Sequence, residues 1–179
     1  WALVGENGSA IDSAAPKKPL LMLVGPDGAL LTVSTGLGEG LQLSAIAHLT
    51  SSATNTNKHY MIAGSLAPNG NTSATTMWIG ELDWSDPGVP KIVRSATCGK
   101  APSGGTQIGS LTWHGSHLTR LAGGGWALGG YAEFDNFEYA TQFPALCHFD
   151  ANLALVGEPI QDTDQGGTRQ IVAREDGGY

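Results

Sequence analysis

Trp126-Ala-Leu-Gly-Gly130 is the stretch that decides the fold, because the chain carries three versions of it. Each version begins with an aromatic residue and ends four positions later with glycine, with apolar residues between them. The other two are Trp1-Ala-Leu-Val-Gly5 and Tyr60-Met-Ile-Ala-Gly64. This aromatic–glycine motif returns at a spacing of roughly 55 to 65 residues, which indicates an internal repeat of three similar units.

The second unit shows the repeat in complete form. Its apolar segments are short and are separated by clusters of Gly, Pro, Asn and Ser, a pattern typical of antiparallel strands joined by turns. The predicted strands are Leu41 to Thr50, His59 to Gly64, Thr76 to Asp83 and Lys91 to Arg94. No window of the chain keeps a helical period, so we expect almost no helix.

The third and first units follow the same order. The third unit has predicted strands at Thr106 to His114, Gly125 to Gly130, Phe143 to Phe149 and Leu153 to Val156. In the first unit, Pro19 to Val24 and Ala29 to Val33 follow the motif at Trp1. The strand that should precede this motif is found at the other end of the chain, in residues 166–179.

The sequence therefore predicts one domain of three units, which span 166–179 with 1–38, then 39–100, then 101–165. Four antiparallel strands joined by hairpins describe the blade of a β-propeller. One blade cannot cover its own two apolar faces, so blades stack around an axis. The predicted fold is all-β, with three four-stranded antiparallel blades that form half or part of a propeller ring. A β-sandwich is the alternative.

A second pattern marks the third strand of the units. Gly80-Glu-Leu-Asp83 and Cys147-His-Phe-Asp150 each end on Asp, and Leu23-Val-Gly-Pro-Asp27 is a looser version. Together with the aromatic–glycine motif, these segments resemble the degenerate β-propeller repeats of bacterial exported and surface proteins. The resemblance covers nearly the whole chain. It implies that the strand before each aromatic–glycine motif is the innermost strand of its blade.

Composition narrows the class of protein. The chain has 26 Gly, 9 Pro and only 14% charged residues, which suits a turn-rich β protein. The net charge is −7 without a Lys/Arg cluster, so no nucleic-acid partner is expected. No apolar stretch is long enough for a membrane span. Cys98 and Cys147 are the only cysteines, and two readings stay open: buried free thiols, or one disulfide between neighbouring units.

The candidate ligand-binding residues lie near the innermost strands. His114 and His117 stand in Thr112-Trp-His-Gly-Ser-His117, the densest polar and aromatic cluster. A polar hairpin tip explains this cluster better than a metal site, since no third ligand is near in sequence. His48 and Arg174 occupy places comparable to His114 in the other two units. The full candidate set is His48, Trp113, His114, His117 and Arg174, and no metal, cofactor or catalytic residue is expected.

The long segment from Tyr131 to Gln142 is predicted to be an acidic and aromatic loop. Its carboxylates Glu133, Asp135 and Glu138 alternate with aromatic residues. Such a loop can bind sugars or proteins, but capping of a blade edge is the favoured interpretation.

Three blades are too few to close a ring, since propellers have roughly four to eight. We therefore expect a second copy of the chain or a companion polypeptide to complete it. The sequence favours a non-catalytic binding or structural module that is secreted, periplasmic or at the cell surface. The start at Trp1 without an initiator Met fits a removed leader or a piece of a longer polypeptide. An enzyme at the channel mouth, acting as a glycan hydrolase or lyase, and a lectin-like carbohydrate-binding module are the alternatives.

Overall fold

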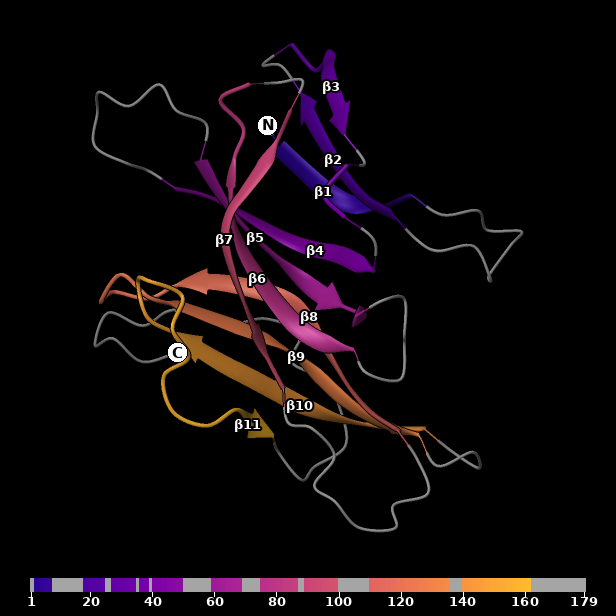
Figure 1. Cartoon of the computed structure of the whole chain (residues 1–179), viewed down its shortest axis with the longest axis vertical. Coiled ribbons are helices and arrows are strands. Elements are labelled where there is room, and N and C mark those ends of the chain that lie inside the picture. The colour runs from indigo at the N-terminus through magenta and orange to yellow at the C-terminus, as the bar shows by residue number, and fades with distance from the viewer. Residues whose placement is uncertain are drawn as a thin grey trace.

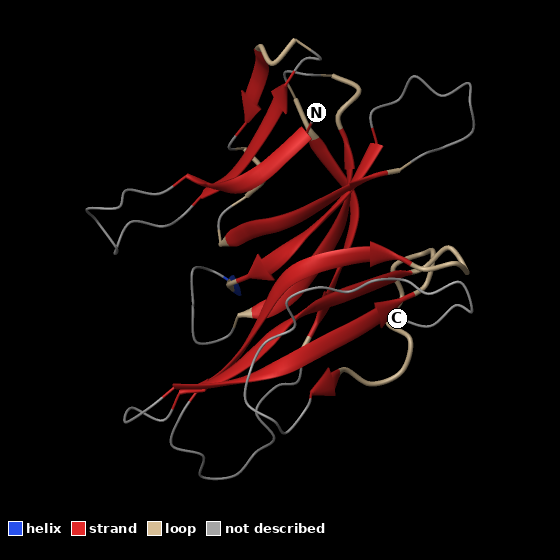
Figure 2. Cartoon of the chain, turned by 180° about the vertical axis from the view of Figure 1, so that it is seen from behind, coloured by secondary structure: helices blue, strands red, loops and turns tan. Residues whose placement is uncertain are grey.

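The computed structural model describes residues 2–7, 18–24, 27–34, 36–38, 40–49, 59–68, 75–86, 89–99, 110–135 and 140–161. In this part of the chain, strands β1 to β11 form three antiparallel sheets and no α-helix is present. Figure 1 shows the sheets following one another from top to bottom in chain order, and Figure 2 shows how strands dominate the molecule. The prediction of an all-β fold is confirmed.

Sheet 1 contains the start of the chain. Its strands are β1 (Ala2–Asn7), β2 (Lys18–Val24) and β3 (Leu30–Ser34), in the order β1-β2-β3. Along β2, Pro19, Leu21 and Leu23 are buried and alternate with more exposed residues, as expected for a strand with one covered face. The fourth strand expected here, in 166–179, lies outside the described residues, as does Trp1.

Sheet 2 has four strands in the order β4-β5-β6-β7, which are β4 (Leu41–His48), β5 (His59–Leu66), β6 (Thr76–Asp83) and β7 (Lys91–Cys98). The four strands predicted in this unit are all present. β7 continues four residues beyond the predicted end at Arg94. Most of its side chains are exposed, which is typical of an edge strand, so no apolar run marks its length.

Sheet 3 contains β8 (Ser110–Arg120), β9 (Trp126–Asp135), β10 (Ala140–Phe149) and β11 (Ile160–Gln161), in the order β11-β10-β9-β8. The prediction of a hairpin tip at His114 and His117 is wrong, because both residues lie inside β8. The polar residues of this strand alternate with Trp113 and Leu118, which face the core. The strand continues past its predicted end because Gly115 to Arg120 pair with Trp126 to Gly130 of β9.

The prediction of a loop from Tyr131 to Gln142 is also wrong. β9 extends to Asp135 and β10 begins at Ala140. Phe134 pairs with Leu111 of β8, and the Gln142 amide nitrogen donates to the Glu133 carboxylate across the strands at 2.8 Å. The acidic and aromatic residues therefore alternate between the faces of a hairpin. Glu138 lies outside the described residues.

The strand predicted at Leu153 to Val156 is interrupted. Asp150 Oδ1 accepts hydrogen bonds from the backbone nitrogens of Asn152 and Ala154 at 2.8 Å, which tightens a turn. Leu153 then has a positive φ of 66°, and only Leu155 forms a bridge, to Phe149. The regular pairing resumes in β11, where Ile160 lies opposite Leu146.

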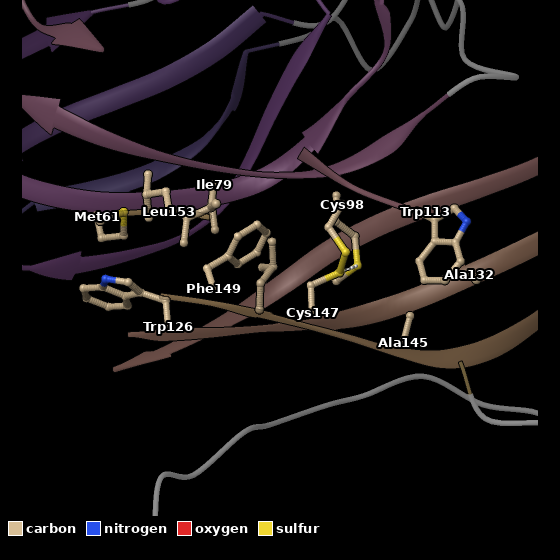
Figure 3. Close-up of a cluster of buried hydrophobic side chains, with 13 residues drawn as sticks. Met61, Ile79, Cys98, Trp113, Trp126, Ala132, Ala145, Cys147, Phe149 and Leu153 are labelled. Carbon is tan, nitrogen blue, oxygen red and sulfur yellow. Dashed lines mark hydrogen bonds between the residues drawn. A yellow bond between two sulfur atoms is a disulfide. The ribbon is translucent and has the colours of Figure 1, made fainter. Parts of the chain in front are cut away.

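Two hydrophobic cores lie between the three sheets. The first joins sheets 1 and 2 and contains Leu21, Leu23, Leu41, Leu43, Tyr60, Ile62, Trp78, Leu82 and Trp84. The second joins sheets 2 and 3 and contains Met61, Ala63, Met77, Ile79, Cys98, Trp113, Trp126, Leu128, Ala132, Ala145, Cys147, Phe149 and Leu153. Figure 3 shows part of the second core. Sheet 2 is therefore covered on both faces, which explains the unbroken run of buried residues in β5.

A disulfide between Cys98 and Cys147 joins the outer strand of sheet 2 to β10 of sheet 3 (Figure 3). The two Cα atoms are 6.4 Å apart, and the sequence separation is 49 residues. Of the two readings of the cysteines, the structure confirms the disulfide between neighbouring units.

The motif glycine has a steric explanation in sheets 2 and 3, whereas a Cβ atom at Gly5 of sheet 1 would meet nothing within 4 Å. A Cβ atom at Gly64 would overlap the carbonyl oxygen of Gln42, and a Cβ atom at Gly130 would overlap the carbonyl oxygen of His114. In both cases the obstacle is backbone of the preceding strand, which cannot turn away as a side chain can. Only glycine fits at these positions.

We expect Gly130→Ala to lower the free energy of unfolding by about 1–3 kcal/mol or more, because the new methyl group must displace backbone. Urea unfolding followed by tryptophan fluorescence would measure the loss. The matched control is Gly123→Ala, since no atom lies within 4 Å of a Cβ at Gly123. Equal stability of the two variants would contradict the steric explanation.

Reduction of the disulfide should lower the free energy of unfolding by about 4 kcal/mol, from the chain-entropy estimate for a closed loop of this length. Urea unfolding of the wild type with and without reductant would measure the difference. In a Cys98→Ala/Cys147→Ala variant the reductant should have no effect. Identical unfolding of the oxidised and reduced wild type would refute a stabilising link between the sheets.

Candidate functional site

The first strands of sheets 2 and 3 each contain a β-bulge opposite the motif glycine. In β4 the register shifts between Leu43 and Ala45, and in β8 it shifts between Gly115 and His117. The extra residue is Ser44 in one strand and Ser116 in the other. A bulge re-aims the side chains around it, which makes it a usual place for a functional site.

The bulges define which residues of the two units are equivalent. Ser44 corresponds to Ser116, and Gln42 corresponds to His114. His48 lies opposite Tyr60, as Arg120 lies opposite Trp126. The expected equivalence of His48 with His114 is therefore wrong, because sequence spacing alone does not reveal the pairing register.

A pocket of about 200 Å³ lies where the two bulges meet. It is lined by Gln42, Leu43, Ser44, Ser65, His114, Gly115, Ser116 and Tyr131. These residues come from β4 and β5 of sheet 2 and from β8 and β9 of sheet 3. We refer to this space as the bulge pocket.

Serine side chains tie the walls of the bulge pocket together. The Ser44 hydroxyl donates to the carbonyl oxygen of Gly115 at 2.6 Å, and the Gly115 backbone nitrogen donates to Ser65 Oγ at 3.2 Å. Both bonds cross from sheet 2 to sheet 3. Within sheet 3, the Ser116 hydroxyl donates to the carbonyl oxygen of Gly129 at 3.4 Å. The pocket thus has walls fixed by hydrogen bonds, which is what a binding site requires for a defined shape.

His114 forms the aromatic side of the bulge pocket. Its ring stacks on Tyr131, with centroids 4.7 Å apart and an angle of 20° between the planes. Its Nε2 lies 3.0 Å from Thr112 Oγ1. Burial lowers the pKa of His114, and the nearby carboxylate of Glu133 opposes this by a smaller amount. The imidazole is therefore neutral at neutral pH.

His48 lies in a separate pocket. This space of about 320 Å³ is lined by Ala2, Ile46, His48 and Tyr60, between sheets 1 and 2. The rings of His48 and Tyr60 meet edge to face, with centroids 5.3 Å apart. His48 and His114 therefore do not share a site.

The remaining candidates divide in three ways. Trp113 is only 1% exposed and belongs to the core between sheets 2 and 3, and no described group accepts a hydrogen bond from its Nε1. His117 lies on β8 but lines neither of these two pockets. Arg174 is outside the described residues. Among the four candidates that the structure describes, His114 alone lines the bulge pocket.

Sequence reasoning missed Gln42, Ser44, Ser65, Ser116 and Tyr131. The sequence does contain a signal for the two bulge serines, because each lies in the strand just before an aromatic–glycine motif. Serine is common in this chain, however, and the match becomes visible only when the strands are aligned through their bulges.

The described residues contain neither a metal-binding group of side chains nor a membrane-spanning helix. They contain no group of three or more His, Cys, Asp or Glu side chains arranged to hold a metal ion. They also contain no helix with the length and apolar character needed to cross a membrane.

Comparison of the chain with protein-family models finds no match, and comparisons with curated proteins and with solved structures find none either. The function is therefore inferred from the geometry of the sheets and of the bulge pocket.

The pKa of His114 provides a test of the site geometry. In an NMR titration of the histidine ring protons, His114 should titrate below its usual value of 6.5 because the ring is buried. Glu133→Gln should lower this pKa further, since the Glu133 carboxylate raises it. Glu158→Gln, at an exposed site on another segment, is the control and should leave it unchanged. An unchanged or higher pKa in Glu133→Gln would contradict the electrostatic influence of Glu133 on His114.

Proposed function

We propose that the chain is a non-catalytic β-propeller module, exported or at the cell surface, whose ring is completed by further blades. Its role is binding or structural. A second copy of the chain is the simplest source of those blades, and a companion polypeptide is the other.

The packing between successive sheets supports a propeller. β1 and β2 of sheet 1 contact β4, the first strand of sheet 2. β5 and β6, the corresponding strands of sheet 2, contact β8, the first strand of sheet 3. A packing relation that repeats from one unit to the next is how stacked repeats grow. Because β4 also contacts β8, the first strands lie close together, as inner strands around an axis should.

The observation that carries the proposal is the exposure of Leu3. The aromatic–glycine motif aligns Leu3 with Ile62 and Leu128. Ile62 packs toward sheet 1 and Leu128 packs toward sheet 2, and both are 0% exposed. Leu3 is 46% exposed. The face of sheet 1 that should meet a preceding blade is therefore more open than the same face of the other two sheets.

The face of sheet 3 that points away from sheet 2 is also apolar and partly exposed. Leu146 corresponds to Ile79, because they lie opposite Gly129 and Ala63 at the same motif position. Ile79 is buried in the core against sheet 3, whereas Leu146 is only partly buried and its neighbour Ile160 is 55% exposed. This face of sheet 3 is therefore equivalent to the face of sheet 2 that packs against the following sheet. In the proposed ring it would pack against the next blade.

Two copies of the chain would supply both surfaces. The Leu3 face of one copy would pack on the Leu146 face of the other, and a ring of two copies lies within the usual range of roughly four to eight blades. The same contact would bury the open apolar side chains at both ends.

Two site features support an exported, non-catalytic module. The Cys98–Cys147 disulfide is a link that persists in oxidising compartments. In the bulge pocket, the hydroxyls of Ser44 and Ser116 donate to backbone carbonyls. An activated serine nucleophile would instead donate to a base.

Sedimentation velocity over a range of concentrations tests the ring with a second copy. We expect the wild-type chain to assemble and Leu3→Glu to shift it to the monomer, because the carboxylate would be buried at the contact. Val93→Glu is the matched control, since Val93 is similarly exposed at 56% but lies on the outer strand β7. A monomeric wild type, or equal effects of both variants, would overturn closure by a second copy.

A further inference from the structure

We propose that the bulge pocket binds one neutral, polyhydroxylated ring, of the class of a monosaccharide or cyclic polyol. The walls of this pocket come from sheets 2 and 3 of a single chain. The inference therefore does not depend on how the ring is completed.

The charge of the lining residues selects a neutral ligand. The described residues of the lining include three serines, a glutamine, a tyrosine and His114, and none of these described residues is Asp, Glu, Lys or Arg. A charged ligand would lose hydration there without meeting an opposite charge. Because burial also keeps the His114 ring neutral, the pocket supplies hydrogen-bonding groups rather than ionic ones.

The hydrogen-bonding groups that remain available suit hydroxyl groups. No described residue bonds to the side-chain amide of Gln42, which offers both donors and an acceptor. Ser44 and Ser116 use their O–H groups as donors to Gly115 and Gly129, so each oxygen keeps acceptor capacity. A hydroxyl can donate to one such group and accept from another. A ligand with several hydroxyl groups is therefore matched better than a purely apolar one.

The aromatic residues and the volume of the pocket indicate the shape and size of the ligand. His114 and Tyr131, whose rings stack on each other, both line the pocket and place aromatic surface next to the polar groups. The C–H face of a sugar ring is apolar and can lie against an aromatic ring, while its edge carries the hydroxyls. The volume of about 200 Å³ is smaller than the roughly 300–1,000 Å³ of sites for drug-sized ligands, which points to one ring rather than a chain of sugars.

Backbone amide NMR of the full chain tests the proposal. The neutral probes are methyl α-D-glucopyranoside, methyl α-D-galactopyranoside, methyl α-D-mannopyranoside and myo-inositol, and the charged probe is gluconate. At least one neutral probe should cause saturable shifts at Gly115 and Ser116, while gluconate should not. Gln42→Leu should weaken this binding roughly tenfold, because it removes hydrogen bonds but no contact between the sheets. His48→Leu, in the separate pocket, is the control and should leave the affinity unchanged.

Three outcomes would overturn the inference. The first is that no neutral probe shifts Gly115 and Ser116 in a saturable way. The second is that gluconate binds as tightly as the neutral rings. The third is that His48→Leu weakens the binding as much as Gln42→Leu does, which would place the ligand elsewhere.

Discussion

The close contact between Gly64 of β5 and Gly115 of β8 is the constraint on which the rest of the structure depends. A Cβ atom at Gly115 would overlap the Gly64 carbonyl oxygen, so backbone of sheet 2 lies directly against backbone of sheet 3. Gly64 in turn accommodates the carbonyl of Gln42 at the bulge of β4. Ser44 and Ser65 also form hydrogen bonds with the backbone of Gly115. The motif glycine thus fixes the bulge, the distance between the sheets and the polar wall of the bulge pocket at once.

Periodicity and turn residues were enough to predict most strands, because an apolar face and a Gly/Pro boundary are local properties. The strands of sheet 2 show this well, since Thr76–Asp83 has its predicted bounds. Prediction failed where polar residues continue a strand, as in β8 beyond His114 and in β9 beyond Gly130. There the strand is held by pairing with its neighbours, and pairing register is not written in any one segment. The sequence leaves open for the same reason whether Cys98 and Cys147 are free thiols or a disulfide, since this depends on how two sheets face each other.

An exposed apolar side chain is by itself ordinary, and Leu30 and Val93 need no explanation. Leu3 differs because the equivalent positions of sheets 2 and 3 are covered by the sheet that precedes each of them. Ile62 and Leu128 give two internal controls, and both are buried. In a protein with internal repeats, the exposure of a residue in a terminal unit can therefore be compared with that of the equivalent residues in the other units. This comparison separates the open ends of the stack from the ordinary edges of its sheets.

The repeat also explains why the bulge pocket is asymmetric. Equivalent positions supply Gln42 from sheet 2 and His114 from sheet 3, so the backbone repeats while the side chains differ. A site repeated once per sheet would need the same side chains at each position. A pocket between two sheets can instead combine unlike groups that face its interior from different directions. The two bulges provide a similar backbone geometry, and the different residues Gln42 and His114 give the two sides of the pocket different chemistry. The aromatic stack of His114 on Tyr131 has no counterpart in sheet 2, because the residue of sheet 2 that corresponds to Tyr131 is Ser65.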